Sequence, residues 1–260
     1  MNLPSSPSSR RFDGRHVLIT GAAAGIGAAI AQRLADEGAS LILLDRDEQA
    51  LAAVAERLGK DTHHYAVDVS DAAQTEQVFD RIQTDCGRIH AAVLNAGIVS
   101  LRIPLHEVAV EDFDRILAVN VRGVFLWLSR LLGRMREHRG GAITITASTA
   151  GLKGTIGMAP YVASKHAVVG LMKSAALEAA PFGIRVNCVN PGPVETAMME
   201  SVDRSTGDLE VARRRGFASI PLGRYGSTHE IAAITAFLCS DDASFCTGAT
   251  YLADGGLTAR

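Results

Sequence analysis

Short apolar runs alternate along the chain with longer segments in which apolar positions recur every three or four residues. The short runs are typical of strands and the longer segments of helices. Strands are expected at 16–20, 40–45, 64–67, 90–95, 142–147, 184–189 and 249–253. Helices are expected at 25–37, 47–58, 71–86, 111–137, 160–180 and 228–239. The strand at 40–45 is apolar on both faces, which is typical of a parallel sheet covered by helices on both sides. The alternation predicts a doubly wound α/β fold.

A single domain accounts for nearly the whole chain, because no internal repeat or boundary interrupts the alternation. Residues 13–260 are expected to form this domain, and residues 1–12, rich in Ser, Pro and Arg, a flexible tail. One segment, about 195–220, has no clear periodicity and carries several arginines and two methionines. A loop of this length is usually a lid or binding segment, so it is the candidate substrate loop; the alternative is a disordered surface insertion.

Composition and charge exclude several classes of partner. With 260 residues, 47% of them hydrophobic, the chain can bury a core as one domain. A net charge of −2 offers no basic excess for a nucleic acid. No apolar run approaches the ~20 residues of a membrane-spanning helix, and residues 1–11 lack the apolar segment of a secretory signal. We therefore expect a cytoplasmic protein without a nucleic-acid or membrane partner.

The cysteines give no sign of a disulfide framework or a metal site. Cys86, Cys188, Cys239 and Cys246 are widely scattered and form no CxxC pair. Reduced thiols in a cytosolic protein are the simplest interpretation. Zinc binding is the alternative, but neither the cysteines nor the histidines have the spacing of zinc ligands, so no metal site is expected.

A glycine-rich turn joins the first expected strand to the first expected helix. Gly21 follows the strand directly, and Gly25, Ile26 and Gly27 open the helix. Glycine is needed where φ becomes positive and where the backbone must approach a phosphate closely. The helix N-terminus then offers free N–H groups and a positive dipole end to a pyrophosphate. The pattern predicts a dinucleotide site, the alternative being an ordinary strand–helix turn.

An acidic residue at the end of the second strand bears on the choice of dinucleotide. Asp45 lies eighteen residues after Gly27, near the spacing at which a carboxylate meets the adenosine ribose hydroxyls. Its charge would repel a 2′-phosphate and so favours NAD over NADP. Arg46 leaves the choice open, because it could cover a 2′-phosphate or stack on adenine. A capping or turn role is the alternative for Asp45.

Polar and small residues also end the next two strands. Asp68-Val69 follows the third strand and Asn95-Ala96-Gly97 the fourth. Ligands bind at the carboxyl ends of strands in open α/β sheets, so both segments are candidate cofactor contacts. Each of them alone could equally be a simple turn.

A phenol, an ammonium group and a hydroxyl are spaced as in a proton-transfer site. Tyr161 and Lys165 lie four residues apart on one face of an expected helix, and Ser148 lies thirteen residues before Tyr161. A free phenol, with a pKa of ~10, is a poor base near neutral pH. We expect the Lys165 ammonium group to lower the pKa of Tyr161, which would make Tyr161 a general acid/base. Ser148 would hold the substrate oxygen. A surface helix pair is the alternative for Tyr161 and Lys165.

Taken together, these residues resemble the short-chain dehydrogenase/reductase family over nearly the whole chain, from about residue 15 to residue 256. The matching motifs are Thr20-Gly-x3-Gly-Ile-Gly27, Asp68-Val69, Asn95-Ala96-Gly97, Asn120, Ser148, Tyr161-x3-Lys165, Asn190-Pro191-Gly192 with Val194 and Thr196, and Asp254-Gly255-Gly256. The resemblance implies a single-domain Rossmann-type fold with a seven-stranded parallel sheet. It also implies NAD(P)-dependent interconversion of alcohols and carbonyls in a homotetramer or homodimer. The departures, an N-terminal extension and Thr149, do not affect the chemistry.

The resemblance also assigns roles to single residues. Lys165 would bond the nicotinamide ribose, and Asn120 would anchor a water in a proton relay through Lys165. Pro191, Gly192, Val194 and Thr196 would lie at the nicotinamide, with Val194 and Thr196 against its carboxamide.

The leading hypothesis is an NAD-dependent enzyme that interconverts a small secondary alcohol and a ketone. An NADPH-dependent 3-oxoacyl-thioester reductase is the alternative within the class, and a non-catalytic dinucleotide sensor the alternative outside it. The expected pocket lining contains Met158, Met198, Met199 and Phe217, which favours a largely apolar or cyclic substrate.

Overall fold

A seven-stranded, wholly parallel sheet forms the centre of the computed structural model, which describes residues 10–259. The strands are β1 (His16–Thr20), β2 (Ser40–Asp45), β3 (Thr62–Ala66), β4 (Ala91–Leu94), β5 (Gly141–Thr146), β6 (Ile184–Pro191) and β7 (Thr250–Ala253). Their order in the sheet is β3-β2-β1-β4-β5-β6-β7. This is the doubly wound, Rossmann-type arrangement that the sequence pattern predicted.

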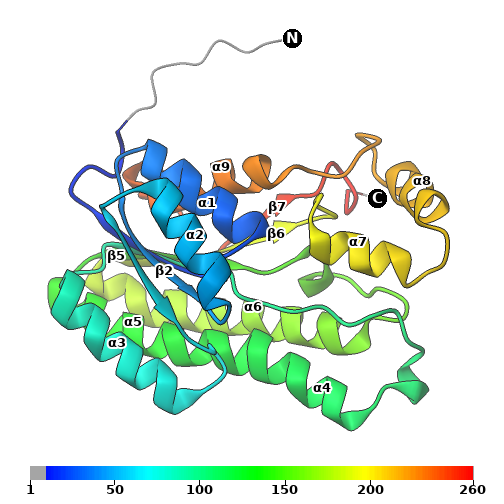
Figure 1. Ribbon diagram of the computed structural model, residues 1–260, viewed down its shortest axis with the longest axis horizontal. Helices are drawn as coiled ribbons and strands as arrows, with labels where there is room; N and C mark the ends of the chain where they lie inside the picture. Colours follow the sequence, from blue (N-terminus) through cyan, green and yellow to red (C-terminus); the bar gives the residue numbers. More distant parts are fainter. Residues whose placement is uncertain (1–9, 260) are drawn as a thin grey trace.

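Helices cover both faces of the sheet (Figure 1). The longer ones are α1 (Gly25–Asp36), α2 (Glu48–Leu58), α3 (Ala72–Cys86), α4 (Val110–Leu117), α5 (Val124–His138), α6 (Ala159–Ala179), α7 (Ala197–Arg204), α8 (Leu209–Ser219) and α9 (Thr228–Cys239). Buried side chains of α1, α2 and α9 pack on one face of the sheet. Those of α3, α5 and α6 pack on the other, so each face has its own apolar core.

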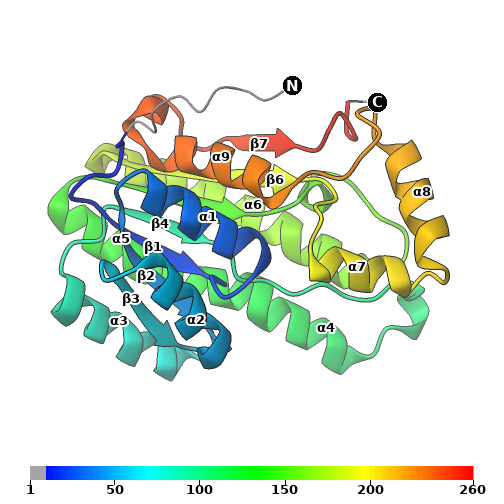
Figure 2. The same ribbon diagram turned by 45° about the horizontal axis from the view of Figure 1, so that its top comes forward.

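The strand order reverses direction between β1 and β4, and ligands bind at such a switch point in open α/β sheets. Thr20, the last residue of β1, is paired in register with Leu94, the last residue of β4. The arrows of β1 and β7 point toward the end of the molecule where α7 and α8 lie (Figure 2). The two helices therefore stand beyond the carboxyl ends of the strands.

The segment around 195–220, expected to be a loop or an insertion, is instead largely helical. It forms α7 and α8, and each begins at a capping side chain. Thr196 Oγ1 accepts the N–H of Met199, and Asp208 Oδ1 accepts that of Val211. Capping satisfies N–H groups that have no partner within the helix, so both helices form despite a weak apolar pattern.

The other elements begin and end within two residues of their expected bounds. The third strand, expected at 64–67, lies at Thr62–Ala66. The helix expected at 111–137 is one continuous helical run from α4 to α5, but a π-helical segment, η2 (Ala118–Gly123), interrupts its α-helical bonding. Asn120 lies within this wider turn, which is a form of irregularity frequent at functional sites.

The expected tail, residues 1–12, lies mostly outside the described residues. Its last part, however, belongs to the folded domain: Phe12 is fully buried, and Arg11 forms an ion pair with Glu37 at 2.6 Å. The boundary expected at residue 13 was therefore too late.

By length and composition alone, one helical run in residues 10–259, Val110–His138, could cross a membrane; 39% of its most apolar stretch is buried inside the protein. A core helix passes the same test. Along α5, the side chains of Trp127, Leu128 and Leu131 are part of the core beneath the sheet.

Candidate active site

The glycine-rich turn leaves no room for side chains. A Cβ on Gly21 would lie 2.8 Å from Cα of Ala96, and one on Gly27 would lie 1.9 Å from the carbonyl oxygen of Gly21. Gly21 also has a φ of 67°, in the left-handed region that favours glycine. Ile26, between Gly25 and Gly27, packs its side chain on the core instead. The turn thus exposes backbone at the N-terminus of α1, which fits a bound pyrophosphate.

Hydrogen bonds join this turn to the end of β4. Thr20 Oγ1 accepts the backbone N–H groups of Asn95 at 3.0 Å and Ala96 at 3.1 Å. The Asn95 amide in turn donates to the carbonyl oxygen of Gly21 at 3.1 Å. The two predicted cofactor segments are therefore brought together at the switch point. Thr20 opens the glycine-rich motif, but sequence reasoning gave its hydroxyl no role, although a hydroxyl at a strand end was the available signal.

Asp45 is held against the glycine-rich turn. Its Oδ2 accepts the N–H of Ala23 at 3.1 Å, and its Oδ1 accepts that of Asp47 at 3.1 Å. The cap of α2 is Asp47, whose side chain accepts the N–H of Ala50, so Asp45 is not the helix cap. Asp45 does have a turn role, and this role fixes its carboxylate beside the turn. The neighbouring Arg46 is exposed.

The end of β3 lies on the same edge. Asp68 is exposed, and its Oδ1 accepts the backbone N–H and the hydroxyl of Ser70. Val69 is buried and packs closely on Gly123 of η2, where a Cβ would meet Val69 Cγ2 at 3.0 Å. Val69 also lines a small cavity together with Thr20 of β1 and Leu94 of β4, so the Asp68-Val69 pair lies near the ends of these strands.

Tyr161 and Lys165 project from the first turns of α6, which begins at Ala159 with Pro160 in its first turn, where proline is favoured. Lys165 Nζ donates to the carbonyl oxygen of Thr146 at 2.9 Å and lies 5.6 Å from the centre of the Tyr161 ring. The Tyr161 hydroxyl forms a hydrogen bond with Ser148. Three of the four predicted catalytic side chains therefore meet at the ends of β5 and α6.

Burial, not the ammonium group, dominates the ionisation of Tyr161. Burial raises the pKa of Tyr161, and the hydrogen bond with Ser148 lowers it in part. Burial also lowers the pKa of Lys165 to about 8. The expectation that Lys165 would lower the pKa of Tyr161 is thus not met, because burial disfavours both charged forms.

Asn120 is buried in η2, and its side-chain amide forms hydrogen bonds with other protein groups. Its Oδ1 accepts the N–H of Ile98 at 2.8 Å, and its Nδ2 donates to the carbonyl oxygen of Ile98 at 2.9 Å and to Ser164 Oγ at 3.0 Å. A Cβ on Gly97 would lie 3.3 Å from Asn120 Oδ1 and 3.6 Å from Lys165 Nζ. Asn120 therefore holds the chain after β4 next to Lys165. Sequence reasoning missed Ser164, because a helical serine carries no signal of its own.

The segment after β6 closes the other side of the site. Gly192 packs on Asp254, where a Cβ would lie 2.9 Å from Cα of Asp254. Val194 is buried, and Thr196 caps α7. A Cβ on Gly25 would lie 3.6 Å from Thr196 Cγ2, so Thr196 faces the glycine-rich turn. Pro191 is the buried last residue of β6.

Across residues 10–259, no group of three or more His, Cys, Asp or Glu side chains is placed to hold a metal ion.

Comparison with known proteins identifies the family. The family model described as enoyl-(acyl carrier protein) reductase matches residues 21–258. Levodione reductase of Leifsonia aquatica is 40% identical over 100% of this chain and 99% of its own, and a crystal structure of levodione reductase superposes with a TM-score of 0.93 over 96% and 99% of the two chains. The chain belongs to the short-chain dehydrogenase/reductase family. Members of this family are oxidoreductases that act on CH–OH groups with a nicotinamide dinucleotide.

Two further relatives show how varied the family's substrates are. A 3-oxoacyl-[acyl-carrier-protein] reductase of Thermotoga maritima is 38% identical over 95% of this short-chain dehydrogenase/reductase and 99% of its own chain. The crystal structure of an NAD⁺-bound xylitol dehydrogenase superposes with a TM-score of 0.91 at 35% identity, over 95% and 100% of the two chains.

Proposed function

We propose that this protein interconverts a small secondary alcohol and a ketone with NAD(H), and that Tyr161 is the general acid/base. The observation that carries the proposal is the meeting of Tyr161, Ser148 and Lys165 beside a glycine cradle at one edge of the sheet. A non-catalytic dinucleotide sensor would need the cradle but not this cluster.

The residues of the site have separate roles around the reacting oxygen. A bound nicotinamide ring supplies or accepts the hydride at carbon. Ser148 holds the substrate oxygen, and Tyr161 takes the hydroxyl proton in alcohol oxidation or returns a proton to the oxygen in ketone reduction. Lys165 lies below the Tyr161 ring, and its positive charge stabilises the phenolate once the site is assembled. Asn120 positions the backbone of Ile98 next to this group.

The cradle fits the dinucleotide. Backbone N–H groups of the glycine-rich turn and the α1 N-terminus would bind the pyrophosphate, and Asp45 the adenosine ribose. Asp68, Val69, Asn95 and Ala96 would line the adenosine half, and Lys165, Val194 and Thr196 the nicotinamide half. Asp45 supports NAD, since its carboxylate, held beside the glycine-rich turn, would repel a 2′-phosphate on the adenosine ribose.

An NADPH-dependent 3-oxoacyl-thioester reductase is the second candidate. The exposed Arg46 and the similarity to the Thermotoga maritima reductase favour it. A screen of secondary alcohols with NAD⁺ and NADP⁺, and of 3-oxoacyl thioesters with NADH and NADPH, following the absorbance of the reduced nicotinamide, separates the candidates. We expect turnover of small alcohols with NAD⁺. A strong preference for NADPH together with 3-oxoacyl thioesters would favour the second candidate instead.

We further propose that the substrate lies under α7 and α8. We also propose that the enzyme is cytoplasmic and that it works as a homotetramer. Free, mostly buried cysteines support a reducing compartment. An apolar groove of ≈ 670 Å³ supports an interface with a second copy; it is lined by Asp114, Leu117, Ala118, Val121, Arg122, Phe125, Ala167 and Leu171. Phe125 is 52% exposed there, and large exposed apolar patches commonly mark protein interfaces.

A further inference from the structure

Trp127, the one tryptophan of the chain, has a polar atom that the protein leaves unpaired. The residue lies in α5 with 1% of its surface exposed, and its ring packs against Phe79 with 6.1 Å between ring centres. Its Nε1 has no hydrogen-bond partner among the described residues. An indole N–H is only a donor, and leaving it unpaired in a core is unfavourable. The atom therefore points to a partner that is not part of the protein.

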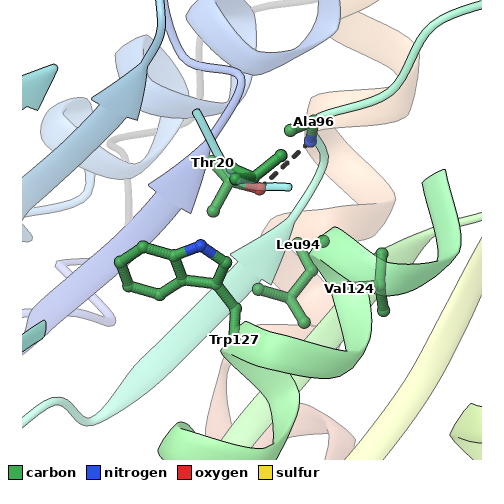
Figure 3. A pocket seen from close by; sticks show the side chains of 7 residues that line it. Thr20, Leu94, Ala96, Val124 and Trp127 are labelled. Carbon is green, nitrogen blue, oxygen red and sulfur yellow. Dashed lines mark hydrogen bonds between the residues drawn. The ribbon is translucent and has the colours of Figure 1, made fainter. Parts of the chain in front are cut away.

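The indole nitrogen lies beside a small cavity, on the edge of the ring that faces Thr20 (Figure 3). The cavity has a volume of ≈ 10 Å³ and is lined by Thr20, Val69, Leu94, Ala96, Gly123, Val124 and Trp127. One water molecule needs about 10–15 Å³. The cavity therefore has room for one water and for no larger ligand.

Thr20 offers a second donor to this space. Its Oγ1 accepts two backbone N–H groups, from Asn95 and from Ala96, and these occupy both lone pairs of the hydroxyl oxygen. The hydroxyl hydrogen is then left to donate. Within residues 10–259 the structure records no acceptor for this hydrogen.

Val69 offers the acceptor. A Cβ on Gly123 would lie 3.3 Å from the carbonyl oxygen of Val69, and both residues line the cavity. In the described part of the chain no N–H group donates to this oxygen. A water that accepts from Trp127 and Thr20 and donates to Val69 would make three hydrogen bonds, the usual number for a buried water.

We propose that this cavity binds one structural water, which ties α5 to the end of β1 and to the segment after β3. Thr20 positions the backbone of Asn95 and Ala96, and Val69 follows Asp68 directly. The water thus supports the floor of the adenosine half of the site. The existence of the water does not depend on the proposed function, but its effect on nucleotide binding rests on the proposed cofactor site.

A crystal structure at a resolution that shows ordered waters tests the site itself. We expect one isolated peak of density about 2.7–3.2 Å from Trp127 Nε1 and Thr20 Oγ1. An empty cavity, or an indole nitrogen bonded to a protein atom, would overturn the proposal.

Trp127→Phe tests the effect of the water, because it removes the N–H donor and keeps an aromatic ring. Phe79→Leu is the matched control: it disturbs the packing of the same ring but leaves Nε1 and the cavity lining in place. Calorimetric titration with ADP-ribose should show a Kd raised roughly two- to ten-fold in Trp127→Phe, as for one lost hydrogen bond, and an unchanged Kd in Phe79→Leu.

The outcomes separate the two claims. Equal Kd values for Trp127→Phe and the unmodified protein, with the water present in the crystal, would overturn the supporting role. Failure of the unmodified protein to bind ADP-ribose would instead contradict the proposed cofactor site. The electron density would still show whether the water is present.

Discussion

A buried amine beside a half-buried phenol sets the chemistry of the candidate site. Burial lowers the pKa of Lys165 to about 8 and raises that of Tyr161, so near neutral pH the phenol is uncharged while the amine keeps most of its positive charge. A positive charge brought next to them favours the phenolate. The proton-transfer group is therefore expected to ionise only when the site is assembled, which couples proton transfer to cofactor binding.

Replacing Asp45 is expected to change the choice of cofactor. In Asp45→Ala the carboxylate is lost from the proposed ribose contact, and kcat/KM with NAD⁺ should fall by roughly 10- to 100-fold, as for a hydrogen bond to a charged group. Asp45→Asn is the control: it keeps an acceptor for the N–H of Ala23 and removes only the charge, so NADP⁺ should gain relative to NAD⁺. Steady-state rates with both cofactors measure this. An unmodified protein that already prefers NADP⁺ would contradict the cofactor assignment.

At the level of single residues, the identity of the candidate residues could be predicted from the sequence, but their environment could not. Tyr161 and Lys165 are recognisable because a spacing of four places them on one helical face. Their pKa values depend on burial by distant elements, such as Thr146 at the end of β5, and no local pattern encodes it.

Among the elements, α7 is joined to the segment that precedes α9 by a buried polar contact. Asp203 of α7 is buried, and both its carboxylate oxygens accept from the hydroxyl of Tyr225 at 3.2 Å. Tyr225 packs edge-on against Phe217 of α8, with 4.9 Å between ring centres. Gly216 faces the Tyr225 hydroxyl, where a Cβ would lie 2.1 Å away. Tyr225 thus joins the two helices that we propose cover the substrate.

Tyr225→Phe is expected to loosen this cover. It leaves the Asp203 carboxylate buried without its hydrogen bond, which should cost about 1–3 kcal/mol of unfolding free energy. Amide exchange in α7 should speed up, and KM should rise more than kcat falls.

Asp203→Asn is the matched variant, since an amide oxygen can still accept from Tyr225 without a buried charge. Its free energy of unfolding should be unchanged, and amide exchange in α7 should stay as slow as in the unmodified protein. Unchanged exchange and KM in Tyr225→Phe would show that the contact does not hold the helices.

The sequence foretold some elements better than others, for physical reasons. The glycine-rich turn was predictable because its glycines are required by the local backbone, through positive φ angles and close approach of neighbouring atoms. Helix α8 was missed because none of its residues is buried, so it lacks an apolar stripe, although Asp208 was a visible cap. The π-helical turn at Asn120 forms where its side chain bonds the distant backbone of Ile98, and no local spacing signals such a bond.

For the molecule as a whole, a histidine at the amino-terminal edge of the sheet makes the fold sensitive to acid. His90 Nδ1 accepts the backbone N–H of His16 at 3.0 Å, so it must be unprotonated. Burial, helped by the charges of Arg88, His16, Arg15 and His138, lowers the pKa of His90 to about 4. In the unfolded chain the pKa is about 6.5, so the unfolded state binds more protons between these values. The contribution of His90 to stability is present above pH ~6.5 and is lost as the pH falls toward 4.

His90→Asn should therefore make unfolding less dependent on pH in this window, because Asn offers an acceptor that does not titrate. His63→Asn, at an exposed position, is the control and should leave the dependence unchanged. Denaturant unfolding between pH 4 and 7 measures both. An equal slope in His90→Asn and the unmodified protein would contradict the assignment.

The apolar groove on α4, η2, α5 and α6 predicts assembly at the same scale. Light scattering of the unmodified protein should give the mass of a tetramer, and Phe125→Glu should reduce it, because a charge would be buried at the interface. His64→Glu, on an exposed strand position away from the groove, should leave the mass unchanged. A monomeric unmodified protein would contradict the proposed assembly.

The overall architecture was predictable because alternating apolar runs and helical segments leave few arrangements other than a doubly wound sheet. The packing of residues 11 and 12 onto the domain was not, because Phe12 and Arg11 find their partners only in the folded structure.

The most direct test of the central claim is the turnover of a substrate found in the alcohol screen by the Tyr161→Phe variant. Phenylalanine keeps the ring over Lys165 and removes only the hydroxyl that exchanges the proton. With the variant shown to bind ADP-ribose as the unmodified protein does, kcat should fall by about 10²- to 10⁴-fold, the usual contribution of a general acid/base. Undiminished turnover by Tyr161→Phe would contradict the account.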